Sequence, residues 1–320
     1  MQLQEFPPWL ADSEPQLPLP SLVEEINRLY HSLCATKYNR EHPEIFAVLP
    51  PVWKEMVDQL PDCEAWRILD FGCGTGFEAS QILRWKQVKQ LTCFDPSQEM
   101  LGQCRDRLRR IECVSFHTDL DQAMSRGPFN LLLTNSVLHH LANVPQTINA
   151  LLSALTPDAR WLAGHEPSAR FFRNPECLRF VEEYSRYYRW AKFSMPRAYL
   201  TKMRLLLGRH PLRATAKAAL RFGWFKKLPH PLVIDQIVDF HVLHGPDEFE
   251  EGRGLDFERM QNDLAPEWYL DWLRTYSFFG SFKSTDVPGR WLKRSCELAA
   301  RFPHDGANFA AIWSRRGVPR

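Results

Sequence analysis

The chain has 320 residues, and its hydrophobic content of 44% is ample for a sizeable buried core. A formal net charge of +2 argues against a polyanionic partner such as nucleic acid. The acidic, proline-rich start lacks a signal-peptide pattern, and no apolar run approaches 18 residues, so neither a secretory signal nor a transmembrane segment is expected. Eight cysteines without a C-x-x-C pair predict a reduced, cytoplasmic protein without a metal site.

The first 60 residues predict an irregular start followed by helices. Residues 1–20 are proline-rich, and a helix is expected from Ser21, with Ser21 as its N-cap and Glu24 as the capping-box partner. A further helix is expected from Pro51 to Leu60, leading into the first strand.

Residues 67–78 carry the most informative pattern, a short apolar strand followed by glycines at alternate positions and then a helix start. Gly72, Gly74 and Gly76 allow a tight turn and a close approach of the backbone to a ligand. Their spacing is G-x-G-x-G rather than the G-x-G-x-x-G of dinucleotide-binding folds. Asp70, two residues before the first glycine, would repel a pyrophosphate but suits an ammonium group. The motif therefore indicates a cationic ligand.

Strands and helices alternate from residue 67 to about residue 165, which predicts a parallel sheet with helices on both faces. The expected strands after the first cover residues 90–95, 113–119, 129–135 and 160–164. Further along, residues 266–276 predict a helix, residues 280–286 a sixth strand and residues 308–314 a seventh. A carboxylate such as Asp95, placed at the end of a strand, can accept both hydrogen bonds of a ribose diol.

These motifs, in this order, resemble the class I S-adenosylmethionine-dependent methyltransferases. The resemblance implies an α/β, Rossmann-like fold: a seven-stranded, mostly parallel sheet with helices on both faces, an N-terminal helical lid and a helical insertion after the fifth strand. It implies S-adenosyl-L-methionine as the cofactor and an antiparallel seventh strand beside the sixth. The expected domains are an irregular segment and lid over 1–60, a cofactor-binding core over 61–166, a substrate-cover insertion over 167–265 and the rest of the core over 266–320.

The resemblance also implies roles for particular residues. The glycine loop would hold the cofactor, Asp95 its ribose, and Asp119 its adenine amino group, although either aspartate taken singly could equally cap a helix. Tyr38 could belong to the lid or be an ordinary packed tyrosine. The expected cofactor-binding residues are Asp70, Gly72, Cys73, Gly74, Gly76, Asp95, Pro96, Met100, Asp119, Leu120, Asn135 and Ser136.

Three histidines at expected strand ends are the candidate catalytic bases: His139, His140 and His165. Histidine is suited to removing a proton from a hydroxyl or an acidic carbon near neutral pH, and the alternative is a structural role for each. His241 and His244 share an i, i+3 spacing without a matching carboxylate, so no metal is expected there. Thr134-Asn135-Ser136-Val137 lacks the Asn/Asp-Pro-Pro-aromatic signature of many nitrogen methyltransferases, which favours oxygen or carbon as the methylated atom.

The insertion divides by charge: residues 168–230 hold 15 Lys/Arg against 3 Glu, and residues 231–271 hold 11 Asp/Glu against 2 Arg. Its basic half, rich in aromatics, could cover the substrate with its own aromatic core, contact an anionic membrane surface or an amphiphilic acceptor, or bind nucleic acid. The sequence thus predicts a methyltransferase acting on an oxygen or carbon of a small-molecule or lipid-like acceptor. The alternatives are an RNA or other nucleic-acid methyltransferase and a non-catalytic protein that binds S-adenosylmethionine.

Overall fold

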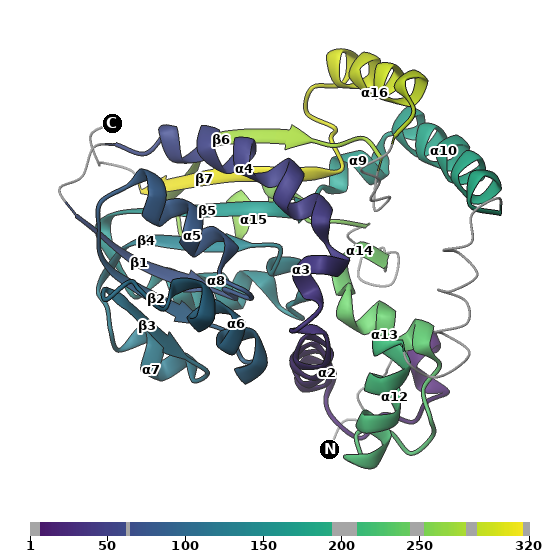
Figure 1. Ribbon diagram of the computed structural model, residues 1–320, viewed down its shortest axis with the longest axis horizontal. Helices are drawn as coiled ribbons and strands as arrows, with labels where there is room; N and C mark the ends of the chain where they lie inside the picture. Colours follow the sequence, from purple (N-terminus) through teal and green to yellow (C-terminus); the bar gives the residue numbers. More distant parts are fainter. Residues whose placement is uncertain (1–6, 62–64, 194–209, 244–252, 280–286, 316–320) are drawn as a thin grey trace.

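A seven-stranded sheet forms the centre of the protein in a computed structural model, which describes residues 7–61, 65–193, 210–243, 253–279 and 287–315 (Figure 1). The strand order is β3-β2-β1-β4-β5-β7-β6. Strands β1 to β5 are parallel, and β7 runs antiparallel between β5 and β6. The strands are β1 Trp66–Phe71, β2 Val88–Phe94, β3 Val114–His117, β4 Phe129–Asn135, β5 Leu155–Pro167, β6 Trp268–Tyr276 and β7 Asn308–Arg315. This order and the antiparallel β7 confirm the expected class I methyltransferase sheet.

Helices cover both faces of the sheet because successive residues of each buried strand point to opposite sides. In β1, Ile68 packs in the cluster formed with α4, α5 and α6, whereas Leu69 packs against α7, α8 and α15 on the other face. Burying each such side chain contributes roughly 1.5–3 kcal/mol, so both layers hold the register of the strands. These helices are α4 Pro43–Asp58, α5 Phe77–Trp85, α6 Gln98–Leu108, α7 Leu120–Met124, α8 Val144–Leu152 and α15 Phe257–Asp263.

The N-terminal helices and the middle of the insertion share one hydrophobic core. Leu22 and Ile26 of α2 are fully buried in a cluster with Ala216 of α12 and Ile234 of α13. Figure 1 shows α2, α12 and α13 side by side at the end of the molecule where α3 also lies. The helices are α1 Pro8–Ala11, α2 Leu19–Cys34, α3 Tyr38–Glu41, α12 Pro211–Arg221, α13 Pro231–Val238 and α14 Phe240–Leu243.

A second cluster joins the start of the insertion to the C-terminal part of the chain. Phe180 and Tyr184 of α10 are buried against Phe278 and Trp291. The elements involved are α9 Ala169–Arg173, α10 Pro175–Phe193 and α16 Gly289–Arg301, and α10 and α16 lie together at one corner of the molecule (Figure 1). Several aromatics of the basic half are therefore buried in a core that the insertion shares with the C-terminal part of the chain.

Two local predictions were wrong. Residues 266–276 form no helix, because Trp268–Tyr276 is the edge strand β6, paired only with β7. The run places apolar residues at both helical and alternating spacings, and pairing with β7 decides between them. The first long helix starts at Leu19 with Pro18 as N-cap, so Ser21 lies inside it.

Two further points concern the limits of the described chain and its helices. The sixth strand expected over 280–286 lies outside the described residues. Among the helices that the structure describes, none is long and apolar enough to cross a bilayer.

Candidate functional site

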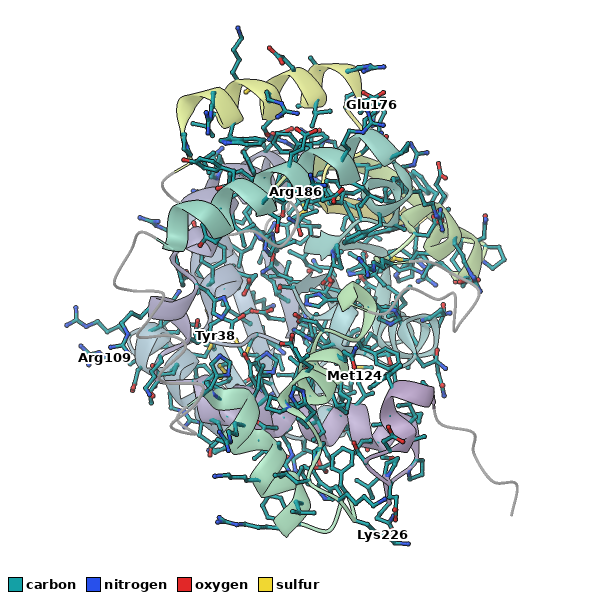
Figure 2. The ribbon with its side chains drawn as sticks, turned by 90° about the vertical axis from the view of Figure 1, so that its right-hand side faces the viewer. Tyr38, Arg109, Met124, Glu176, Arg186 and Lys226 are labelled. Atoms are coloured by element: carbon teal, nitrogen blue, oxygen red, sulfur yellow. The ribbon has the colours of Figure 1, made fainter. Side chains whose placement is uncertain are left out.

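A cavity of about 500 Å³ lies where β1, β2 and β4 end, and helix α2 and Tyr38 of α3 complete its wall (Figure 2). It brings together residues that are far apart in the sequence. Of the expected site residues, the wall contains Gly72, Cys73, Gly74, Asp95, Pro96, Met100, Leu120, Asn135, Ser136 and His140.

The three glycines of the loop all have positive φ, at 72° for Gly72, 52° for Gly74 and 77° for Gly76. A Cβ at Gly72 would lie 2.4 Å from Val137 Cγ2, and one at Gly76 would lie 2.7 Å from Cys104 Sγ. A Cβ at Gly74 would meet nothing within 4 Å, and Gly74 lines the cavity. Gly72 and Gly76 are therefore required by packing, whereas Gly74 leaves the backbone open to a ligand.

Asp95 ties the glycine loop to the next strand. Its Oδ2 accepts a hydrogen bond from Gly74 N at 2.9 Å, and its Oδ1 accepts one from Ser97 N at 2.8 Å. Ser97 Oγ in turn accepts from Met100 N at 3.2 Å as the N-cap of α6, which positions Met100 in the wall. Burial raises the pKa of Asp95 to about 6. Each carboxylate oxygen keeps a lone pair for a diol.

Two more acids lie beside the loop. Asp70 is 1% exposed, and its Oδ2 has no hydrogen-bond partner among the described residues. It lies beneath the loop rather than in the wall of the cavity. Glu78, in the first turn of α5, does line the cavity, and burial raises its pKa to about 8. Burial, and then Glu78, raise the pKa of Asp70. A cationic ligand would relieve the unfavourable burial of these carboxyl groups.

Asn135 connects this acidic site to α4. Its Oδ1 accepts a hydrogen bond from Trp53 Nε1 at 2.9 Å, and its Nδ2 donates to Glu78. Sequence reasoning did not include Glu78; its only signal was an acid in the first turn of the helix after the glycines.

Asp119 is placed differently from expectation. It is exposed, and its Oδ1 accepts from Gln122 N at 2.8 Å as the N-cap of α7. Its neighbours Thr118 and Leu120 line the cavity, but Asp119 does not. The adenine role of Asp119 stays a prediction.

Two neutral histidines face one another at the cavity. The Nδ1–H of His140 donates to Val238 O at 2.5 Å, and that of His31 donates to Asn27 O at 2.9 Å, because a carbonyl can only accept. Nε2 of each ring then carries the lone pair. Burial, followed by the imidazole of His140, lowers the pKa of His31 to about 3, and burial, followed by the imidazole of His139, lowers the pKa of His140 to about 3. Their ring centroids lie 5.0 Å apart. His31 was missed, because nothing in the linear sequence brings α2 to this wall.

The structure does not bring the other two candidate bases to the cavity wall. His139 Nδ1 lies 2.8 Å from Glu166 Oε2, and Glu166 also accepts from the backbone N–H groups of Val137 and Leu138. This buried pair holds the 3-10 turn Leu138–His140 in place. His165 lies within β5, which continues to Pro167, and shares a 3.0 Å hydrogen bond with Tyr276 Oη. Both residues therefore have contacts within the fold and do not line the cavity, and their catalytic role stays a prediction.

The thiols of Cys73, Cys93 and Cys104 lie within 4.8 Å of one another, buried in the core under the glycine loop. Their sequence spacing gave no sign of this cluster. No disulfide joins any of the seven cysteines that the structure describes.

The region around this cavity is similar to known methyltransferases. Residues 69–161 match the family model described as a methyltransferase domain. The chain is 34% identical over 116 residues to a trans-aconitate 2-methyltransferase of Pseudomonas aeruginosa, covering 36% of this chain and 41% of that protein. It is 27% identical over 104 residues to a malonyl-[acyl-carrier protein] O-methyltransferase of Bacillus cereus, covering 31% and 38%. The matches thus span about two fifths of these relatives.

A solved S-adenosylmethionine-dependent methyltransferase from Mesorhizobium loti aligns with 83% of this chain and 96% of its own, at 14% identity and a TM-score of 0.44. We base no conclusion on a similarity of this size, because the strand order by itself shows the fold.

Proposed function

We propose that the protein transfers a methyl group from S-adenosylmethionine to an oxygen or carbon of a small-molecule or lipid-like acceptor, because residues 69–161 match the methyltransferase-domain family model and the strand order is that of a class I sheet. The observation that carries the proposal is the cavity at the strand ends, in which the open backbone at Gly74 and the acids Glu78 and Asp95 meet the polar residues of α2 and α8. Such a cavity can hold a donor and an acceptor together, which is the main requirement for an in-line displacement.

The residues present fit the cofactor. Asp95 would hold the ribose through its remaining lone pairs, Met100 and Leu120 would pack against adenine, and Gly74 leaves room for close contact. Glu78 and the orphaned Oδ2 of Asp70 supply the negative potential that favours a cation. When bound, S-adenosylmethionine supplies a methyl group activated by its sulfonium charge.

The opposite side of the cavity would bind the acceptor. Arg28 is the one lysine or arginine among the described residues of the wall, and Asn143, Gln146 and Thr147 add groups that can hydrogen-bond. The two relatives are named for acting on trans-aconitate and on a malonyl thioester, both of which carry carboxylates. A carboxylate acceptor is already a nucleophile and needs no base. For a hydroxyl acceptor, the Nε2 atoms of His31 and His140 are the groups able to accept its hydrogen bond.

The wall also contains apolar residues, among them Val23, Phe46 and Leu141, which suit an acceptor with an apolar part. We also propose peripheral contact of the protein with an anionic membrane surface. Exposed Phe222, beside the basic residues of α12, supports this contact. The burial of Phe180, Tyr184 and Phe225 in cores shared with the N-terminal helices and the C-terminal part of the chain favours instead an insertion that covers the substrate. A cytoplasmic location belongs to the same proposal.

The test is methyl transfer from labelled S-adenosylmethionine by the purified full chain to panels of small carboxylic acids, acyl thioesters, phenols and fatty acids, with RNA as a further substrate class. We expect a labelled methyl ester, methyl ether or carbon-methylated product from one of the small-molecule panels. Transfer only to RNA would favour the nucleic-acid alternative. Tight binding of the cofactor without transfer to any panel would favour the non-catalytic alternative.

A further inference from the structure

A group of metal-binding side chains lies at the edge of the cavity, from elements that are distant in the sequence. One ring nitrogen each of His139 and His140 and one carboxylate oxygen of Asp239 all lie within 4.8 Å of one another. The histidines belong to the 3-10 turn after β4, and Asp239 is the C-cap of α13 in the insertion. The sequence did not predict a metal site here, because Asp239 comes close to the two histidines only in the folded chain.

Both histidines are held in the form that metals require. The Nδ1–H of His139 donates to the buried carboxylate of Glu166 at 2.8 Å, and the Nδ1–H of His140 donates to Val238 O at 2.5 Å. Each bond fixes the neutral tautomer whose lone pair lies on Nε2. Metal-ligating histidines almost always have their other nitrogen bound to a carboxylate or a backbone carbonyl in this way.

Asp239 is suited to be the third ligand. Its side chain is half-buried, and its carboxylate makes no hydrogen bond or ion pair with the described residues. Tetrahedral ligands about 2.1 Å from a metal lie about 3.4 Å apart. The three ligand atoms lie within 4.8 Å of one another, so binding one ion at the ideal spacing requires the side chains to draw together.

We propose that His139, His140 and Asp239 bind one divalent first-row transition-metal ion beside the cavity, which only His140 of the three lines. Two imidazoles and one carboxylate leave coordination positions open, a set typical of zinc or non-haem iron sites that bind a further ligand. His140 lines the cavity, so the open positions are accessible to an oxygen of a molecule within it. Only this last link to an acceptor rests on the proposed function; the metal site itself does not.

The test is titration of the full-length, chelator-treated protein with Co²⁺, followed by its visible absorption, and with Zn²⁺, followed by calorimetry. We expect one equivalent to bind. Asp239→Asn should weaken binding by at least tenfold, and Glu166→Gln, which loosens His139, by about 10- to 100-fold. The matched control is Asp235→Asn, one turn earlier on α13 and outside the cluster, which removes a neighbouring charge but no ligand and should weaken binding far less than Asp239→Asn.

Three results would overturn the proposal. The first is the absence of saturable metal binding, and the second is equal metal affinities of Asp239→Asn and Asp235→Asn. The third is a near-ultraviolet absorption band of cobalt-bound thiolate that Asp239→Asn does not change, which would place the ion on Cys73, Cys93 and Cys104. Melting curves establish that each variant is folded, and Asp239→Asn is informative even if Glu166→Gln fails to fold. Calorimetry of S-adenosylhomocysteine with the metal-free protein separates failure of the metal site from failure of the cofactor site.

Discussion

Replacing Asp95 with alanine tests the geometry of the cofactor site most sharply. The carboxylate is 8% exposed and holds Gly74 N at 2.9 Å and Ser97 N at 2.8 Å. Its remaining lone pairs are assigned here to the ribose diol. Hydrogen bonds to a charged group contribute about 1.5–3 kcal/mol. A loss of about 2–3 kcal/mol corresponds to roughly 30- to 140-fold weaker binding.

Calorimetry of S-adenosylhomocysteine with wild type, Asp95→Ala and Asp95→Asn measures this loss directly. Asp95→Asn retains one acceptor oxygen, so its affinity for S-adenosylhomocysteine should lie between those of the wild type and Asp95→Ala. Asp121→Ala is the control, because Asp121 is an exposed acid in the first turn of α7 that does not line the cavity. An affinity of Asp95→Ala within about twofold of wild type would refute the ribose assignment.

Three further predictions concern the acids and the glycines. Burial raises the pKa of Glu78 from 4.5, its value in the unfolded chain, to about 8 in the folded protein. The contribution of this carboxyl group to stability is therefore fully present below pH 4.5 and is lost as the pH rises through 8. Melting temperatures should therefore fall from pH 5 to pH 9, and less steeply in Glu78→Gln; an identical pH profile for the two would contradict this. A cationic ligand should lower the raised pKa values of Glu78 and Asp70, so the protein should release protons when it binds S-adenosylmethionine at pH 7. Binding of S-adenosylhomocysteine, whose sulfur is uncharged, should release fewer protons. Calorimetry in buffers of different ionisation enthalpy measures this, and equal release by both ligands would count against it. Gly74→Ala should cost about 1–2 kcal/mol of stability for its positive φ and weaken cofactor binding at least tenfold. Gly72→Ala should lower the melting temperature further, because its Cβ would clash with Val137; equal melting temperatures would speak against that reasoning.

The core of the fold could be predicted because its signals are local. The glycine spacing and the alternation of apolar strands with helices lie within short stretches, and the sheet of β1 to β5 follows from them. The edge strand β6 could not be predicted in the same way. Its residues are half-buried and pair only with β7, so apolar spacing alone fits a helix as well.

The site was predicted unevenly for a similar reason. Gly74, Asp95 and Met100 follow strand ends, and parallel strands place such residues at one edge of the sheet. His31 reaches the cavity only because α2 packs on α12 and α13, a contact between segments some 180 residues apart. Asp239 meets His140 through the same packing. Contacts of this kind depend on tertiary structure and have no periodic signal in the sequence.

The most direct test of the account is a thermal-shift comparison of S-adenosylmethionine, S-adenosylhomocysteine and NAD on the purified protein. A ligand at 100 times its dissociation constant stabilises the native state by about 2.7 kcal/mol, which corresponds to several degrees for a chain of this size. The account predicts a shift with both sulfur compounds and none with NAD. A shift with NAD, or with none of the three, would contradict it.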